Sequence, residues 1–366
     1  MIRKKIPIKL NYSFLLLLIF FSVICYSCIK NSTPIENFVF PEAENHNIDV
    51  TQLTSAFVNA SQIEDLQGLA VARDNEIVAE KYFNNADPEP DPNLHVMSVT
   101  KSITATLVGI AIEEGYLKSV NQTVSEFLPD ESEMINPALG QVTIRNLLMM
   151  TCGHDWHEIG VPSEFMNFVN APNQLNYIFQ KPIINTPGTV FNYSDGGAHL
   201  VSVILTKATG MSTSEFADTY LFGPMGIGDK IWYPDKQGYS YGGVRLCLGN
   251  HDMIKIGFLY LNNGYYNGCQ IVSSAWIDTV TSFKISTHNL IPFLSDYGFF
   301  WWLGTAHGHN FFCANGYGGQ FIFVVRDLDL VVSSRTDYRV SELKAGENWY
   351  NVLNIIVNQI LPAVNP

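Results

Sequence analysis

Positive charge is scarce in this sequence, which has 21 Lys and Arg residues against 34 Asp and Glu and a net charge of −13. Binding to nucleic acid requires a basic face, so the composition excludes nucleic acid as a partner and disfavours a polyanionic substrate. Only 15% of the residues are charged and 47% are apolar, which predicts a folded body with a substantial core.

Motifs that bind metals or nucleotides are also missing. The glycine-rich stretches 238–249 and 315–319 have neither a GxGxxG pattern nor a Walker lysine. His154, His157 and Glu158 are the only suggestion of a metal site, and they lack the HExxH spacing and a further ligand placed by sequence. We therefore expect no metal and no cofactor.

No apolar run is long enough to span a bilayer, but the N-terminus has the pattern of an export signal. Basic residues precede the apolar run from Phe14 to Tyr26, which is shorter than the roughly 20 residues of a membrane-spanning helix. Ser27 then precedes Cys28, as at a bacterial lipoprotein cleavage site. We expect residues 1–27 to be a signal peptide and Cys28 to be lipidated, which would hold an exported protein at the membrane of the periplasm or cell envelope. An uncleaved anchor and plain secretion are the alternatives.

The order of expected elements predicts the architecture of the remaining chain. The polar segment 28–50 is typical of a tether, and residues 51–366 are expected to form the folded domain. Strand patterns occur near its start, at 69–83, and again at 311–334, whereas residues 116–235 are mostly helical patterns. The fold class is therefore α/β (α+β), with one antiparallel sheet built from both chain ends and a helical lobe inserted between them.

The chemistry is expected at Ser98 and Lys101, although the Ser-x-x-Lys pattern is weak by itself. It occurs three times, and the pairs Ser27/Lys30 and Ser341/Lys344 are attributed to chance. Only Ser98 follows an extended segment and opens an apolar helix, where a serine and a lysine three residues apart share one face. A lysine base could then activate the hydroxyl. The alternative is a capping serine followed by a solvated lysine.

Two later segments contain the other candidate groups. Tyr193 lies in a Gly-rich turn before a helix, where a phenol can exchange a proton with a lysine of similar pKa. The glycines at 316–319 would let a substrate approach a strand edge, and a backbone amide there could face the Ser98 amide as an oxyanion hole. A packed tyrosine and an ordinary hairpin turn are the alternatives. Trp156, Trp301 and Trp302 could line a substrate pocket, or belong to the core.

Together these segments resemble the serine β-lactamase-related family, which includes class C β-lactamases, D-alanyl-D-alanine peptidases, family VIII esterases and 6-aminohexanoate-dimer hydrolases. The matching motifs are Ser98-Val-Thr-Lys101, Tyr193-Ser-Asp195 and Gly316-Tyr-Gly-Gly-Gln320, and the likeness extends from about residue 65 to 335. The resemblance implies a β-lactamase/penicillin-binding-protein-like fold with an antiparallel sheet flanked by terminal helices.

The resemblance also implies roles for individual residues. Ser98 would be acylated, Lys101 and Tyr193 would act as base and acid, and the backbone amides of Ser98 and Tyr317 would form the oxyanion hole. Substrate contacts would come from the three residues that complete the motifs, namely Asp195, Asn315 and Gly316.

Two departures from the family pattern limit the expected activity. Asp195 stands where the family usually has Asn, and Ala314 stands where it usually has Lys or His, the cation that helps hold a β-lactam carboxylate. We therefore expect a serine hydrolase that cleaves small carboxylic esters or amides. The alternatives are a β-lactamase or D,D-peptidase, or a catalytically weak penicillin-binding-type sensor.

Overall fold

The computed structural model describes residues 38–366 except 88, 92, 132, 159–162 and 366, and residues 38–366 form one compact unit. The expected signal peptide and Cys28 lie outside the described residues. The expected tether does not extend to residue 50, because the folded body begins at Phe38. Helices α2 (Pro41–Asn45) and α3 (Val50–Ala60) follow at once, and Phe40 and Ile48 are buried. Apolar residues inside a polar segment therefore decide where the body starts.

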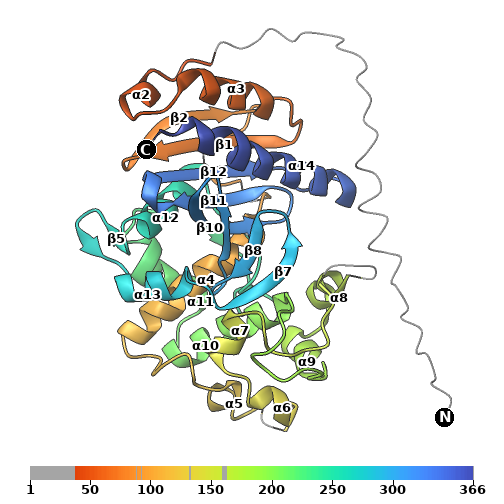
Figure 1. Ribbon diagram of the computed structural model, residues 1–366. Coiled ribbons are helices and arrows are strands. Elements are labelled where there is room, and N and C mark those ends of the chain that lie inside the picture. The colour runs from red at the N-terminus through yellow and green to blue at the C-terminus, as the bar shows by residue number, and fades with distance from the viewer. Residues whose placement is uncertain (1–37, 88, 92, 132, 159–162, 366) are drawn as a thin grey trace, which may run out of the picture. The chain divides into compact units, whose positions relative to one another are not determined.

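An eight-stranded antiparallel sheet crosses the domain, in the order β2-β1-β12-β11-β10-β9-β8-β7 (Figure 1). The first strand along the chain, β1, lies between β2 and the last strand, β12, which confirms a sheet built from both chain ends. The β1–β2 hairpin turns at Asp74 and Asn75, which both have positive φ, as its two-residue turn requires. The strands are β1 (Leu66–Arg73), β2 (Glu76–Tyr82), β7 (Ile285–Ile291), β8 (Leu294–Tyr297), β9 (Trp302–Ala306), β10 (His309–Gly316), β11 (Gln320–Val325) and β12 (Leu330–Thr336).

Helices cover both faces of the sheet. On one side lie α2, α3 and α14 (Glu342–Ile355), and on the other lie α4 (Val99–Glu113), α12 (Asn250–Leu261) and α13 (Ser274–Val280) (Figure 1). A Cβ added to Gly257 of α12 would lie 2.3 Å from Val331 and 3.4 Å from Ile322, so these two side chains face α12. Because neither face meets solvent, every residue of β11 and β12 is buried.

The helical lobe occupies the middle of the chain, as expected, and its helices run from residue 124 to 222. Its longest helix, α10, begins with Asp195 and packs against α4, which brings the lobe to the sheet. Gly210 ends α10 in the left-handed conformation. The lobe comprises α5 (Val124–Phe127), α6 (Pro137–Gly140), α7 (Ile144–Leu148), α8 (Glu164–Asn170), α9 (Gln174–Phe179), α10 (Asp195–Thr209), α11 (Thr213–Ala217) and η2 (Asp218–Phe222).

Short elements complete the unit. Within the part of the chain that the structure describes, no helix has the length and apolar character needed to cross a membrane. The short elements are β3 (Ile231–Trp232), β4 (Leu246–Cys247), β5 (Tyr265–Tyr266), β6 (Cys269–Gln270), η3 (Arg326–Leu328), η4 (Ile356–Ile360) and η5 (Leu361–Ala363).

Candidate active site

Ser98 stands at a sharp turn where an extended segment meets α4. Met97 has a φ of 49°, a conformation that costs a non-glycine residue on the order of 1 kcal/mol, and its carbonyl accepts hydrogen bonds from the amide and hydroxyl of Thr100. Ser98 is the N-cap residue of α4, but its hydroxyl makes no capping hydrogen bond. The partly exposed hydroxyl is therefore not used as a cap, which counts against the alternative of a capping serine.

Lys101 is buried rather than solvated, with 1% of its surface exposed. Its Nζ donates to the Ser98 Oγ at 2.9 Å and to the Gly243 carbonyl at 3.0 Å, and it forms an ion pair with the Asp195 carboxylate. Asp195 is itself 3% exposed. The amine therefore has a fixed position against the hydroxyl, held there by two acceptors from distant parts of the chain.

Tyr193 lies over the same lysine, with the Lys101 Nζ 4.8 Å from the centroid of its ring. The ring stacks on Trp302 at 5.7 Å and meets Tyr297 edge-on at 6.5 Å. Burial and the nearby Asp195 carboxylate hold the pKa of Tyr193 well above its usual value, while the Ser98 hydroxyl acts in the opposite direction. The phenol is therefore protonated before the reaction begins, which suits a general acid better than a general base.

The backbone of the motif that begins at Gly316 lies against the segment that precedes Ser98. A Cβ added to Gly316, at the end of β10, would lie 2.6 Å from the carbonyl oxygen of Val96, so β10 ends against the segment that leads into Ser98. Tyr317 follows in the turn, with 41% of its surface exposed. Only a glycine permits this approach of two backbones.

Asn315 does not face Ser98. Its Oδ1 accepts a hydrogen bond of 2.7 Å from Trp349 of α14, on the other face of the sheet from α4. It pairs across the ladder with Phe321, whose ring is also next to Trp349, with 6.1 Å between ring centroids. Alternation along the strand directs this side chain away from the site, so the expectation that it binds substrate there is corrected.

Two glycines that sequence reasoning missed belong to the site. A Cβ on Gly243 would lie 2.3 Å from Asp195 Oδ1 and 3.1 Å from Lys101 Nζ, and a Cβ on Gly242 would lie 2.2 Å from the Ala198 carbonyl. The paired glycines therefore let residues 242–243 pass directly against α10 and present a carbonyl to Lys101. The only sequence signal was the Gly-Gly pair itself, in a stretch that lacks a nucleotide motif.

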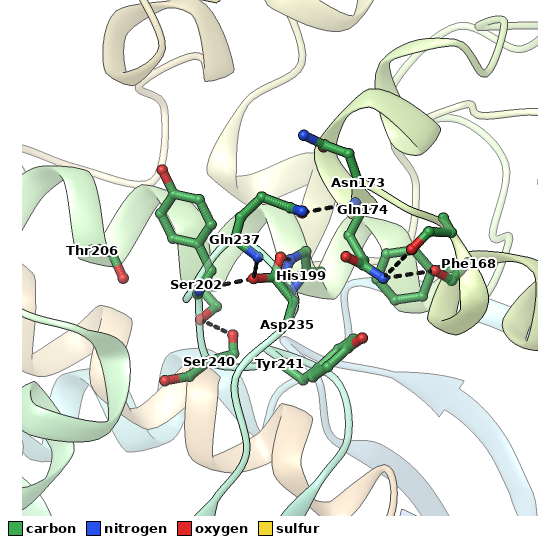
Figure 2. A network of polar contacts seen from close by, with 12 residues as sticks. Phe168, Asn173, Gln174, His199, Ser202, Thr206, Asp235, Gln237, Ser240 and Tyr241 are labelled. Carbon is green, nitrogen blue, oxygen red and sulfur yellow. Dashed lines mark hydrogen bonds and ion pairs between the residues drawn. The ribbon is translucent and has the colours of Figure 1, made fainter.

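A buried polar network holds the loop before these glycines (Figure 2). His199 of α10 bonds Asp235 at 3.0 Å, and the other oxygen of Asp235 accepts from the amides of Gln237 and Tyr239. Ser202, one turn further along α10, donates to the Ser240 carbonyl at 2.7 Å. The same helix that begins with Asp195 thus also fixes the approach of the chain to Gly243.

Glu158 is a second acidic residue of the site, and sequence reasoning considered it only as a metal ligand. Its Oε2 accepts hydrogen bonds from the Asp195 amide, at 3.1 Å, and from the Trp156 indole. Burial and the Asp195 carboxylate raise the pKa of Glu158 well above its usual range. A carboxyl with a raised pKa therefore lies next to the Lys101–Asp195 pair.

Comparison with known proteins identifies the family of the chain. A profile of the Beta-lactamase family matches residues 52–245, which is more than half of the chain. The chain belongs to the Beta-lactamase family. It is 25% identical over 223 residues to a 6-aminohexanoate-dimer hydrolase of Paenarthrobacter ureafaciens, and 26% identical over 209 residues to a lovastatin esterase of Penicillium rubens. These matches cover 57% and 51% of this chain, and the chain spans only 55% and 51% of those two relatives.

The likeness to solved structures confirms the fold. An octameric penicillin-binding protein homologue from Pyrococcus abyssi superposes with a TM-score of 0.64 at 19% identity, over 85% of this chain and 78% of that one. The expected resemblance and fold class are therefore confirmed. The profile match and the solved structures together show a protein of the Beta-lactamase family with the fold of penicillin-binding proteins.

The tryptophans and histidines that the sequence suggested as site residues have other positions in the fold. Trp156, Trp301 and Trp302 are at most 4% exposed, so they belong to the core, and Trp302 supports Tyr193 from there. His154 is buried against the Cys152 thiol, whereas His157 is exposed. Across the described residues, no three His, Cys, Asp or Glu side chains come together as a metal site would need.

Proposed function

We propose that this chain is a serine hydrolase that cleaves small carboxylic esters or amides through an acyl-enzyme on Ser98. The observation that carries the proposal is the 2.9 Å hydrogen bond from the buried Lys101 amine to the Ser98 hydroxyl, with Tyr193 over the same amine. Nucleophilic catalysis by serine needs such a positioned base. The two relatives named above, a dimer hydrolase and an esterase, support a carboxylic acid derivative as substrate.

The proposed reaction assigns a task to each group. Ser98 Oγ attacks the substrate carbonyl while its proton passes to Lys101, and the backbone amides of Ser98 and Tyr317 hold the resulting oxyanion. Tyr193 donates its proton to the leaving alcohol or amine as the bond to the carbonyl carbon breaks, and the Lys101 ammonium reprotonates the phenolate. Water then attacks the acyl-Ser98 ester and gives one proton to Lys101. As the bond to the carbonyl carbon breaks, the Lys101 ammonium passes that proton to Ser98 Oγ, and the acid and the free serine are released.

Labelling with a fluorophosphonate probe tests this proposal. Wild type should be labelled at one site, and Ser98→Ala should lose the label. Ser341→Ala is the matched control, because Ser341 heads the other Ser-x-x-Lys pair of the folded body and caps α14. It should lose about 1 kcal/mol of stability and keep the label. Equal labelling of wild type and Ser98→Ala would exclude Ser98 as the nucleophile.

A substrate panel then separates the activities open to this family. We expect nitrophenyl butyrate to be hydrolysed faster than nitrocefin or a D-Ala-D-Ala peptide, because Ala314 supplies no cation at the position where the family holds the carboxylate of a β-lactam or of a D-Ala-D-Ala peptide. Faster turnover of nitrocefin or of the peptide would make the protein a β-lactamase or a D,D-peptidase. Stable labelling by penicillin without turnover would make it a sensor.

We also propose that the chain is exported and anchored through a lipid on Cys28, which rests on the sequence of the N-terminus alone. Radiolabelled palmitate should be incorporated into the wild-type protein in cells and not into Cys28→Ser. Equal incorporation into both would contradict the assignment of Cys28.

A further inference from the structure

The carboxylate that pairs with the lysine of the site has a second carboxyl beside it. Lys101 Nζ pairs with Asp195, and the backbone amide of Asp195 donates to Glu158 Oε2 at 3.1 Å. The Trp156 indole donates to the same Glu158 oxygen. If both carboxyls were ionised, this buried group would carry a net negative charge, which is costly away from water.

We propose that Glu158 is a positioning residue whose carboxyl stays protonated and donates its proton to the Asp195 carboxylate. The proposal deepens the proposed function and rests on it, since it concerns the base Lys101. The pair Asp195/Glu158 then carries one negative charge, and the three groups together are neutral when Lys101 is an ammonium.

Within the described part of the chain, Lys101 is the one cation whose charge acts on Glu158. Lys101, Asp195 and Tyr193 are the titratable groups that face it in the site. Lys181 lies over the neighbouring Trp156 ring at 6.0 Å, but it is paired with Glu164. On the same loop, His157 pairs with Asp155 at 3.1 Å.

The consequence concerns the base. A full charge on Asp195 would hold Lys101 as an ammonium, which cannot accept the proton of Ser98. A hydrogen bond from Glu158 spreads that charge over two carboxyls and weakens the attraction between Asp195 and the Lys101 ammonium. Lys101 is then better able to accept the proton of Ser98, and Asp195 still stabilises the ammonium that forms when Ser98 attacks.

Substitutions of Glu158 separate this role from a purely structural one. Glu158→Gln keeps a neutral donor to Asp195, so kcat/KM should stay within about threefold of wild type, with an unchanged pH profile. Glu158→Ala removes the donor, so the acidic limb of the kcat/KM profile should move up by about one pH unit, with a roughly tenfold loss on that limb. In an Asp195→Asn background the two Glu158 variants should have the same profile.

Two results would contradict this role of Glu158. A shift as large in Glu158→Gln as in Glu158→Ala would mean that an ionised Glu158 is required, and no shift in either would mean that Glu158 does not act on Lys101. Thermal unfolding reports whether Glu158→Ala is folded. A protonated-carboxyl infrared band that is lost in Glu158→Gln tests the proton without any turnover, so it still decides the point if Ser98 proves not to be the nucleophile.

A different observation concerns substrate recognition. Arg245 lies between two backbone contacts with the Ser98 segment, because the Gly243 carbonyl accepts from Lys101 and the Leu246 carbonyl accepts from the Val96 amide at 2.8 Å. Its guanidinium lies over the Tyr241 ring at 5.0 Å and has no carboxylate partner among the residues that the structure describes. Arg245 is partly exposed and has a φ of 67°, an unfavourable conformation for a long side chain.

We infer that Arg245 binds a carboxylate of the substrate, so that the substrates are esters or amides that also carry an acidic group. This inference also rests on the proposed function. Two other basic residues lie near Arg245. Arg339 is already paired with Asp337, and His95 is uncharged, so neither competes with Arg245 for a substrate carboxylate. Burial, followed by the charges of Arg245 and Arg339, lowers the pKa of His95 and keeps its ring neutral.

A pair of esters tests this inference. Wild type and Arg245→Gln are compared on nitrophenyl butyrate and on the mono-nitrophenyl ester of glutaric acid. The variant should lose about ten- to a hundredfold in kcat/KM on the acidic ester and little on the neutral one. Arg339→Gln, which loses a guanidinium already paired with Asp337, is the matched control and should discriminate as wild type does. An equal loss on both esters, or no loss, would overturn the inference.

A binding measurement keeps this test separate from the chemistry. Calorimetric titration of Ser98→Ala with the acidic ester should show affinity that is about tenfold weaker when Arg245→Gln is added. If the label on Ser98 fails but this difference remains, the carboxylate site stands and the proposed mechanism falls. If Ser98 is labelled but Arg245→Gln binds the acidic ester as tightly as the parent does, the proposed mechanism stands and the carboxylate site falls.

Discussion

Replacement of Gly243 by alanine is the sharpest test of the site geometry, because it adds one methyl group between two reacting groups. The new Cβ would lie 2.3 Å from Asp195 Oδ1, about 1.1 Å short of an ordinary contact, and 3.1 Å from Lys101 Nζ. The carboxylate and the amine must therefore move by about an ångström. Neither α10 nor α4 can shift easily, since both are buried along most of their length.

The expected loss of rate follows from that displacement. A misplacement of about 1 Å in a catalytic group costs on the order of a hundredfold in rate, which corresponds to about 2.7 kcal/mol in the activation barrier. Overpacking should cost about 1–3 kcal/mol of folding stability as well. The rate of fluorophosphonate labelling gives the first quantity, and urea denaturation gives the second.

Gly346→Ala is the control for this variant. A Cβ at Gly346, on the exposed side of α14, would meet nothing within 4 Å, and alanine there should be neutral or stabilising by about 0.5–1 kcal/mol. Labelling of Gly346→Ala should match wild type. A Gly243→Ala protein that remains folded and is labelled at the wild-type rate would refute the placement of Lys101 and Asp195 described above.

Three further predictions concern single side chains. Tyr193→Phe keeps the ring on Trp302 but removes the phenolic proton, so ester turnover should fall about a hundredfold or more in steady-state assays, with little change in melting temperature. Trp349→Phe leaves Asn315 Oδ1 without its donor on the far face of the sheet, so urea denaturation should show a loss of about 1–2 kcal/mol while labelling of Ser98 stays at the wild-type rate. Burial pushes the pKa of Asp235 upward, but its hydrogen bond with His199 and the backbone donors outweigh this and hold the pKa below 3.8. The stabilisation from this lowered pKa is fully present above the pKa of the unfolded carboxyl and is lost as the pH falls through the lower pKa of the folded state. Asp235→Asn should therefore cost about 2 kcal/mol at pH 7 and progressively less at acidic pH, in urea titrations at several pH values.

Local patterns predicted the elements that position the chemistry. The apolar pattern after Ser98 predicted that this residue opens a helix, and α4 runs from Val99 to Glu113. The strand patterns predicted at 311–334 correspond to β10, β11 and β12. Such signals work because periodicity and turn chemistry act over a few neighbouring residues. The start of the body at Phe38 was missed, because the packing partners of Phe40 and Ile48 lie at Phe57 and near the C-terminus.

The side-chain geometry of the site depends on contacts between distant residues. Lys101 and Asp195 are 94 positions apart and Lys101 and Gly243 are 142 apart, so no local pattern could bring them together. The direction of Asn315 depends on the register of β10 in the sheet, where a shift of one residue would exchange the two faces. No sequence pattern links Glu158 to Ser98 or Lys101, and it joins the site only because the lobe folds back onto the start of α10.

The sequence by itself determined the family, the order of the three motifs and the elements that carry them, since these depend on residue types at short spacing. The tertiary structure decided that Lys101 is buried against Ser98, that Asp195 shares its surroundings with Glu158, and that Asn315 faces α14 instead of the nucleophile. The physical reason is that burial, ion pairing and strand direction arise only when α4, α10 and the sheet pack together, and such packing joins residues that are far apart along the chain.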